Sequence, residues 1–146
     1  MFSHNLKTSI EIAASPEAVW EALVDFDRYN DWNPMLQNMQ AELLVGSPVA
    51  FDVILSETKR MKMKANIAQI EEAVELNWKG GSPLMVSGKH YFRIEKLGDN
   101  SVRLHHGEDF KGLLLPLLAK RLKKGKPLYT AMNEALKKRV ENQGEY

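Results

Sequence analysis

The segment LHHGEDF carries two histidines and two acids side by side, directly before an apolar run. In a β-strand, alternate residues face the same side, so His106, Glu108 and Phe110 share one face, whereas His105 and Asp109 share the other. The face with Phe110 should be buried, and a carboxylate held away from water must be paired, hydrogen-bonded or neutralised. We therefore expect His106 and Glu108 to point into the protein, where they need partners.

The turn that precedes this strand indicates which residues are the partners of His106 and Glu108. A three-residue loop at residues 98–100 would place His90 opposite Glu108 and Phe92 opposite His106. A loop of another length with the same parity would place His90 opposite His106 instead. In the first register a carboxylate meets a side chain that can share its hydrogen bond and charge. We expect His90, His106 and Glu108 to form a polar cluster on the inner wall of the sheet.

Three interpretations of this cluster stay open. It can be a hydrogen-bonded pair that fixes strand register. It can anchor a hydroxyl, carbonyl or carboxylate of an otherwise apolar ligand. It can also be catalytic, with Glu108, His106 or His90 as the general base that takes a proton next to a carbonyl.

A metal site is a further hypothesis, because two histidines and a carboxylate bind non-haem iron and some zinc ions. We expect no metal, since His90 and Glu108 can pair with each other and no further ligand is clearly placed. The sequence holds no cysteine and no GxGxxG, GxxxxGK[ST], GxSxG or HExxH motif. Nucleotide-dependent and common hydrolytic mechanisms therefore lack sequence support, and we expect no cofactor.

The elements that position the cluster belong to one domain of 146 residues, whose 44% hydrophobic and 27% charged content is that of a globular protein. Residues 5–13 alternate as a strand, and Ser15 and Pro16 then begin a short helix as its cap and first residue. A second helical turn ends near Pro34. Further strands are predicted at residues 39–45, 50–57, 61–71, 74–80, 85–97 and 101–110. Short turns between them predict an antiparallel meander, with about seven strands in all.

The C-terminal part carries apolar residues at steps of three and four, which is typical of an amphipathic helix. The stripe comprises Leu118, Leu122, Gly125, Tyr129, Met132, Leu136 and Val140. Because the stripe keeps its phase across Pro127, we predict one long helix kinked there, although Pro127 can also begin a second helix. The whole is an α+β domain whose curved sheet wraps the last helix and leaves a hollow at the open end.

Charge is unevenly distributed, since residues 1–110 hold 11 basic and 16 acidic side chains and residues 111–146 hold 9 and 3. The basic run Lys120, Arg121, Lys123, Lys124 and Lys126 lies between stripe positions. We expect this run to face solvent, and a more specific hypothesis is that it makes transient contact with an anionic membrane surface.

Aromatic residues are not interleaved with the basic run, so we expect no nucleic acid partner. No apolar stretch approaches the roughly 20 residues of a membrane span and no signal peptide is evident, which favours a cytoplasmic protein.

Three segments carry a family resemblance: IEIAASPEAVWEALVDFDRYNDWNP, HHGEDFKGLLLPLL and MNEALKKRVE. On these segments the chain resembles the polyketide cyclase and dehydrase-like branch of the START and birch-pollen-allergen superfamily, whose fold is the helix-grip. The resemblance implies an internal, mostly apolar cavity for lipids, sterols, polyketides or similar molecules. It implies chemistry only weakly, because one fold hosts many functions.

With that fold, Trp32 would lie near the cavity mouth and contact a ligand, or fill a gap in the core. Met61 and Met63 would either belong to the core or line a pocket that adapts to varied ligands. The expected ligand-binding set is His90, Phe92, His106, Glu108, Phe110, Trp32, Met61 and Met63.

Our first hypothesis is a binding or carrier protein for a hydrophobic small molecule. The alternative is a cofactor-independent cyclase or dehydratase that uses the same residues as acid and base. A third hypothesis is a protein-interaction module whose groove takes a partner segment. The oligomeric state stays open.

Overall fold

The computed structural model describes residues 2–82 and 84–142. Its strands form one antiparallel sheet of seven strands in the order β1-β7-β6-β5-β4-β3-β2. The strands are β1 (Phe2–Ile12), β2 (Leu36–Ala41), β3 (Pro48–Ile54), β4 (Arg60–Glu71), β5 (Glu75–Gly81), β6 (Ser87–Gly98) and β7 (Ser101–Gly112). The helices are α1 (Pro16–Val24), the 3₁₀ helix η1 (Phe26–Arg28), α2 (Tyr29–Trp32), α3 (Leu115–Lys124) and α4 (Lys126–Glu141). The predicted α+β helix-grip architecture is confirmed.

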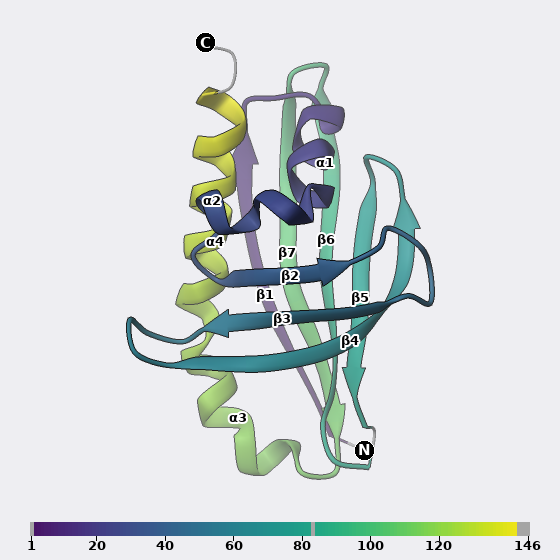
Figure 1. The fold of residues 1–146 in the computed structure, drawn as a ribbon, viewed down its shortest axis with the longest axis vertical. Helices are drawn as coiled ribbons and strands as arrows, with labels where there is room; N and C mark the ends of the chain where they lie inside the picture. The colour runs from purple at the N-terminus through teal and green to yellow at the C-terminus, as the bar shows by residue number, and fades with distance from the viewer. Residues whose placement is uncertain (1, 83, 143–146) are drawn as a thin grey trace.

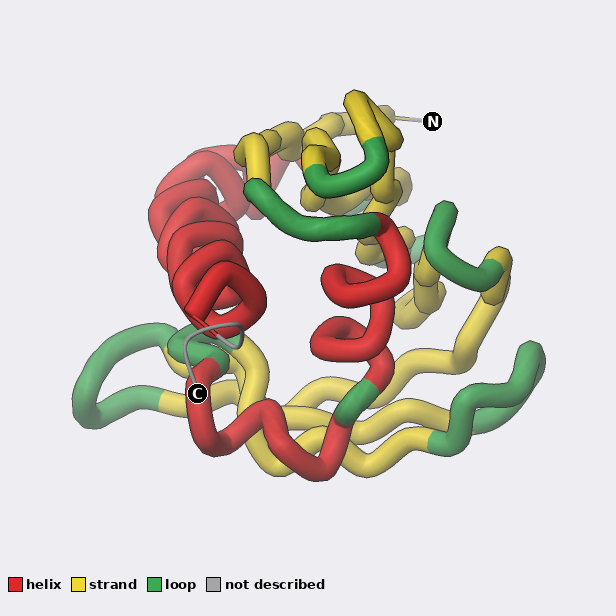
Figure 2. The backbone as a smooth tube through the Cα atoms, turned by 90° about the horizontal axis from the view of Figure 1, so that it is seen from above, coloured by secondary structure: helices red, strands yellow, loops and turns green. Residues whose placement is uncertain are grey.

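The sheet is strongly bent, so that β2, β3 and β4 cross in front of the long strands β1, β6 and β7 (Figure 1). Register shifts between Gln37 and Gln40 and between Ile67 and Gln69 mark irregularities in the bent half, and such bulges increase the local bend of a sheet. Viewed from above, the strands run along two sides and α4 along a third (Figure 2). The inner face of the sheet and the helices therefore enclose the core.

The short helices begin as the sequence predicts. The Ser15 hydroxyl accepts a hydrogen bond from the Ala18 amide at 3.1 Å, and Pro16 occupies the first turn of α1. α2 ends at Asn33, whose side-chain oxygen accepts hydrogen bonds from the Met35 and Leu36 amides at 2.9 Å each. This cap turns the chain from the helices into β2.

The C-terminal helix differs from the prediction of one long helix kinked at Pro127, which is wrong. α3 and α4 are separate helices that meet at Gly125, and Pro127 lies in the first turn of α4. A proline lacks an amide hydrogen that the first turn of a helix does not use, so it begins a helix more readily than it continues one. The stripe is buried only in α4, through Tyr129, Met132, Leu136 and Val140, whereas Leu118 and Leu122 are half-buried.

The core lies between the concave face of the sheet and the helices α1 and α4. Trp78 and Phe92 from the sheet, Leu23 from α1 and Leu136 from α4 are almost fully buried. Trp20 of α1 is buried as well. Within the described residues, no helix is both long and apolar enough to cross a membrane.

Candidate functional site

The pairing of β6 with β7 places the predicted cluster together. His90 lies opposite Glu108 and Phe92 lies opposite His106, which is the first of the two predicted registers. The expected three-residue loop at residues 98–100 is wrong, because Gly98 pairs with Ser101 and the loop has two residues; the register shift between Lys96 and Gly98 compensates for the difference. The strand alternation therefore turns His90, His106 and Glu108 toward the inside of the bent sheet.

His90 joins the other two residues into a row of hydrogen bonds. Its Nδ1 lies 3.2 Å from Glu108 Oε1, and its Nε2 lies 2.7 Å from His106 Nε2. His90 and His106 are 4% and 0% exposed, so both rings are removed from water. The two partners that the sequence offered as alternatives for His90 are thus both bound to it.

Helix α4 adds two residues that the sequence analysis missed as site residues. The Tyr129 hydroxyl donates to Glu108 Oε1 at 2.6 Å, and Asn133 Oδ1 lies 2.7 Å from His106 Nδ1. The two lie one helical turn apart and face the cluster together. The signal for Asn133 was a polar side chain four residues after a stripe residue, where it must be buried and therefore needs a partner.

Strand β1 closes the far end of the row. Asn133 Nδ2 donates to Thr8 Oγ1 at 2.8 Å, and the Thr8 hydroxyl donates to the His106 carbonyl at 2.5 Å. We call this row the buried network; its members are Thr8, Asn133, His106, His90, Glu108 and Tyr129. Four separate elements, β1, β6, β7 and α4, have to be in place to form it.

Aromatic rings pack around the network and exclude water from it. The Phe92 ring stacks on His106 with centroids 4.4 Å apart, and Trp78 stacks on His90 at 5.1 Å. Tyr129 stacks on the same His90 ring at 5.3 Å. In such surroundings hydrogen bonds are electrostatically stronger than in water, and an unpaired polar atom is costly.

Burial also sets the protonation of two network members. Burial, together with the neighbouring His90, holds the pKa of His106 well below its ordinary value, so this ring is neutral. Burial and the nearby Glu108 carboxylate raise the pKa of Tyr129, which therefore keeps its proton. Both groups act as fixed hydrogen-bonding partners near neutral pH.

Glu108 is the open end of the network. Its side chain is 18% exposed, and its Oε2 forms no hydrogen bond within residues 2–82 and 84–142. Oε2 lies directly above Gly88, where a Cβ would approach it to within 2.2 Å. The missing side chain of Gly88 therefore makes room for the carboxylate, and Oε2 is left available to another molecule.

The remaining expected ligand-binding residues are spread more widely. Phe92 and Phe110 are buried, and Phe110 lies opposite Gly88 beside the open end of the network. Met61 and Met63 are 45% and 39% exposed, so they are not core residues. They lie opposite Val53 and Phe51 of β3, on the same face as the buried Phe51.

Trp32 is half-buried and packs against the core. Its ring packs edge-on against Tyr29 with centroids 5.4 Å apart. It lines a hollow of about 110 Å³ whose walls include Asp25, Arg28 and Arg139. The structure therefore groups Trp32 with charged residues of the helices and does not bring it to Glu108.

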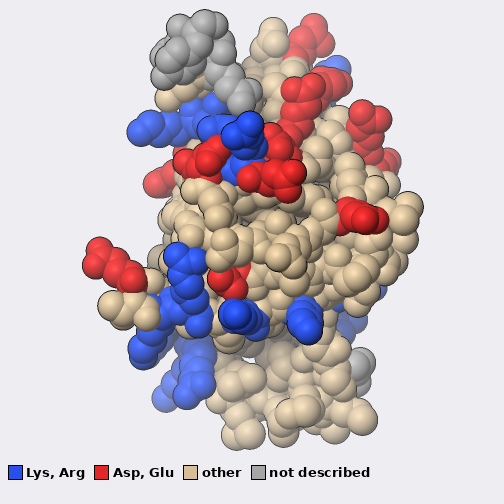
Figure 3. Space-filling model, viewed as in Figure 1, with Lys and Arg blue, Asp and Glu red and all other residues tan. Residues whose placement is uncertain are grey.

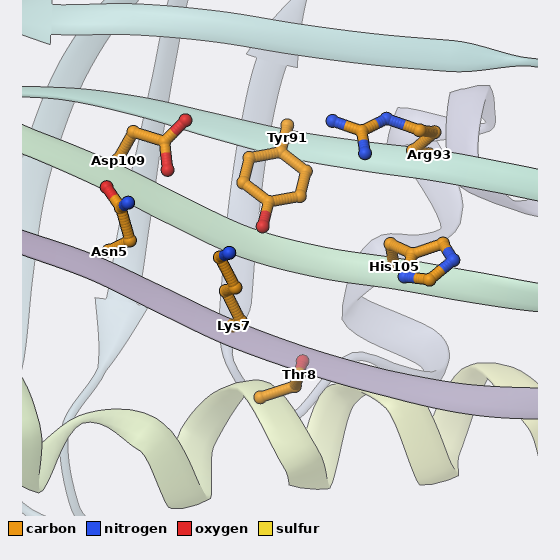
Figure 4. A pocket seen from close by; sticks show the side chains of 7 residues that line it. All are labelled: Asn5, Lys7, Thr8, Tyr91, Arg93, His105 and Asp109. Carbon is orange, nitrogen blue, oxygen red and sulfur yellow. The ribbon is translucent and has the colours of Figure 1, made fainter.

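A second hollow, of about 340 Å³, lies on the outer face of the sheet (Figure 4). Tyr91, Lys7 and His105 point into it, whereas Thr8 points toward the helix on the other side. Burial, then the nearby Asp109, raises the pKa of Tyr91. The walls are polar and the buried network is on the opposite face, so this hollow is not the apolar cavity that the sequence predicts.

Apolar side chains gather at the end of the molecule where α3 begins. Leu84, Met85, Leu113, Leu114 and Leu117 are all exposed, between 38% and 79%, and we call them the apolar rim. The Leu114 amide donates to the Met85 carbonyl at 3.0 Å, and the Leu117 amide donates to the Leu114 carbonyl at 3.1 Å. The β5–β6 loop, the β7–α3 turn and the start of α3 are therefore one connected surface.

The model of the family described as "Polyketide cyclase / dehydrase and lipid transport" matches residues 3–141. The chain belongs to this family. Among curated proteins, none matches the sequence. The family's name covers both enzymes and carriers, so membership by itself does not choose between the two leading hypotheses.

Solved structures show the same fold at low sequence identity. The aromatase/cyclase Zhui from Streptomyces sp. R1128 is 15% identical, with a TM-score of 0.78 over 98% of this chain and 96% of its own. A START superfamily protein from Mycobacterium smegmatis is 22% identical, with a TM-score of 0.72 over 96% and 99%. A norcoclaurine synthase from Thalictrum flavum, as a point mutant in complex with a transition state analogue, is 15% identical, with a TM-score of 0.71 over 98% and 97%.

In this member of the polyketide cyclase and lipid transport family, the candidate site has acid and base groups but no assembled metal centre. Within residues 2–82 and 84–142, no three histidine, aspartate or glutamate side chains are grouped so that they could share an ion. His90 joins Glu108 through one ring nitrogen and His106 through the other, so both of its ring nitrogens are already occupied. Hydrogen bonding and proton transfer are the chemistry that this arrangement offers.

Proposed function

We propose that the protein binds and carries a hydrophobic small molecule, of the lipid, sterol or polyketide-like kind, between the concave face of the sheet and the C-terminal helices. The observation that carries this proposal is the open end of the buried network. Every other polar atom of the network is paired inside the protein, whereas Glu108 Oε2 has no hydrogen-bond partner among the described residues and belongs to a side chain that is 18% exposed. A few convergent polar groups in an otherwise apolar site are typical of small-molecule binding.

A purely structural role explains less of the network. Strand register could be fixed by His90 and Glu108 alone, through the pairing that the turn already specifies. Tyr129 adds a second donor to the same carboxylate and so holds it in one orientation. Oriented polar groups supported by further hydrogen bonds are what a ligand site requires. Met61 and Met63, exposed on the concave side, supply adaptable apolar surface for the rest of the ligand.

The alternative is a cofactor-independent cyclase or dehydratase that uses the same end of the network. Glu108 Oε2 would accept a proton from the carbon next to a substrate carbonyl. The hydrogen bonds of His90 and Tyr129 to Glu108 Oε1 would hold the carboxyl group in place while its charge changes. Glu108→Gln separates the two functions. A carrier should lose affinity modestly, whereas an enzyme with Glu108 as its base should lose turnover while it still binds.

The test of ligand binding is native mass spectrometry of the purified protein, followed by denaturing extraction and identification of whatever was bound. We expect an apolar molecule at near-stoichiometric level. If the protein is empty and a panel of lipids and polyketide-like compounds leaves its Tm unchanged, the binding proposal fails. The network then has a structural role, and the protein-interaction hypothesis becomes the one to pursue.

We further propose that ligand exchange takes place at an anionic membrane surface. The basic run predicted from the sequence is exposed throughout: Lys120, Arg121, Lys123, Lys124 and Lys126. Residues 111–133 contain no acidic side chain at all. Figure 3 shows Lys and Arg gathered beside an uncharged lower end of the molecule, where the apolar rim lies. Exposed apolar side chains next to a basic helix match the chemistry of an anionic lipid surface.

Sedimentation with phosphatidylcholine vesicles, with and without phosphatidylglycerol, tests this surface. We expect binding only to the anionic vesicles, and a loss of about tenfold or more for the double variant Lys120→Glu/Lys123→Glu, since each basic residue contributes about 1 kcal/mol. The matched control is Lys62→Glu/Lys64→Glu, which changes the same charge on exposed positions of β4. Equal binding of both double variants would contradict the proposal.

A further inference from the structure

The direction of each hydrogen bond in the buried network can be assigned, starting from Thr8. A threonine hydroxyl has one hydrogen, and Thr8 gives it to the His106 carbonyl at 2.5 Å. Thr8 Oγ1 can therefore only accept from Asn133, which must present its NH₂ group there, at 2.8 Å. The amide oxygen of Asn133 then faces His106, so the His106 Nδ1 carries a hydrogen and donates it at 2.7 Å.

The assignment passes through His106 to His90. His106 is neutral because its burial lowers its pKa, so a hydrogen on Nδ1 leaves Nε2 as an acceptor. His90 Nε2 lies 2.7 Å from that acceptor and must donate to it. A neutral His90 with its hydrogen on Nε2 would carry a bare lone pair on Nδ1.

His90 Nδ1 faces Glu108 Oε1 at 3.2 Å. An ionised carboxylate against a bare ring nitrogen would set two lone pairs against each other without a hydrogen between them. The pair therefore holds one proton more than a neutral histidine and an ionised glutamate would. That proton lies between His90 and Glu108, either as an imidazolium facing a carboxylate or as a carboxyl group facing a neutral ring.

In both forms the shared proton is on the Oε1 side of Glu108. The Tyr129 hydroxyl also donates to Oε1, at 2.6 Å. Oε2 is then a hydrogen-bond acceptor in either form, and the His90–Glu108 pair has no net charge. Oε2 lies at the open end of the network, over Gly88, and Phe110 lies opposite Gly88 on the neighbouring strand.

We infer that the fixed hydrogen-bond directions in the buried network leave Glu108 Oε2 able only to accept a hydrogen bond, so that the site selects apolar alcohols or phenols. A ligand carboxylate or phosphate would place a second hydrogen-bond acceptor against Oε2 and be repelled. A ketone or ether oxygen would find no hydrogen-bond donor there. This inference rests on the proposed function, because it names the chemical class of the molecule bound. It removes the carbonyl and the carboxylate from the polar groups that the sequence left open.

The binding test compares matched probes on a flat and a linear skeleton: 2-naphthol, 2-methoxynaphthalene and 2-naphthoate, and 1-decanol, decyl methyl ether and decanoate. On the skeleton that fits, the hydroxyl compound should bind about tenfold or more tightly than its methyl ether and its carboxylate. In Glu108→Ala this preference should disappear, while the methyl ether keeps its affinity. Equal affinity of the hydroxyl compound and its ether in the native protein would overturn the inference and leave the proposed function standing.

The proton assignment has a test that needs no ligand. In long-range ¹H–¹⁵N spectra of histidine-labelled protein at neutral pH, we expect His106 as the Nδ1–H tautomer and a protonated Nε2 on His90. The reverse tautomers, Nε2–H on His106 and Nδ1–H alone on His90, would overturn the inference whatever binds. If the tautomers are as expected but no probe of either skeleton binds, the alcohol selectivity fails together with the proposed binding function, and only the proton assignment survives.

Discussion

Gly88 is the residue whose substitution tests the site geometry most directly. A Cβ at this position would lie 2.2 Å from Glu108 Oε2 and 3.2 Å from Glu108 Cδ. Real Cβ atoms do not approach other atoms this closely, so Gly88→Ala must displace the carboxyl group. The displaced Glu108 loses its bonds from Tyr129 at 2.6 Å and with His90 at 3.2 Å.

The magnitude follows from those two bonds. A hydrogen bond to a charged group contributes about 1.5–3 kcal/mol, and the Tyr129 hydroxyl would be left buried without a partner. Against this, replacing glycine by alanine in a compatible backbone stabilises by about 0.4–1 kcal/mol through the unfolded chain. Because Glu108 is partly exposed, the displaced carboxylate can regain some hydration. We expect the free energy of unfolding to fall by about 2–4 kcal/mol.

The assay is urea unfolding, with the midpoint expected to fall and the m value to stay unchanged. Gly98→Ala is the matched control, because it lies in the same strand and its Cβ would meet nothing within 4 Å. The Gly88→Ala change should become nearly neutral in a Glu108→Ala background, since the clash has then been removed. If Gly88→Ala and Gly98→Ala behave alike, the carboxylate does not lie over Gly88 and the description of the open end is wrong.

Two further predictions concern buried polar groups. A histidine whose pKa is lowered by folding binds fewer protons in the folded state, so the free energy of unfolding should fall as pH drops below about 6.5, by at most about 1.4 kcal/mol per pH unit. Urea unfolding at a series of pH values should show this slope in the native protein and in the His105→Gln control. The slope should be absent in His106→Gln, and an unchanged slope there would contradict the prediction. The second prediction concerns Asn33. Asn33→Ala removes the acceptor of the Met35 and Leu36 amides, which should lower the free energy of unfolding by about 2–4 kcal/mol in the same assay. Asn33→Asp keeps an acceptor and should lose clearly less, and equal losses in the two variants would refute this account of the cap.

Local signals in the sequence were sufficient for the sheet and for its inner cluster. The turn at residues 98–100 and the alternation of the flanking strands together determined which residues oppose each other, because a slip by one residue would turn every side chain to the other face. The same reasoning placed His90 opposite Glu108 and turned both inward. Beside the turn, the pairing of Gly98 differs from the predicted register, because alternation does not encode a shift of one residue at the end of a strand.

The contribution of the C-terminal helices was not predictable in the same way. Periodicity indicates which face of a helix is buried, but it does not say which strand residue that face meets. Tyr129 was therefore assigned to the apolar stripe, while its hydroxyl in fact binds Glu108. The break at Gly125 was missed because the phase of a stripe can persist across two helices that meet at one residue.

The exposure of Met61 and Met63 could not be predicted either. Alternation assigns a residue to the inner face of a sheet, but whether that face is covered depends on how far the helix extends along it. Both methionines lie opposite residues of β3 whose side chains point inward, yet both remain accessible. Here tertiary arrangement, and not local pattern, decides burial.

The pairing of β1 with β7 has a consequence for how the protein is made. Thr8 of β1 bonds to groups that lie 98 and 125 positions further along the chain. At about 5–20 residues per second, the first strand waits several seconds for its partners. The row of hydrogen bonds that sets the proton on His90 is therefore absent from every nascent chain that has not yet released Asn133. The buried network therefore forms only after the chain has been synthesised through α4.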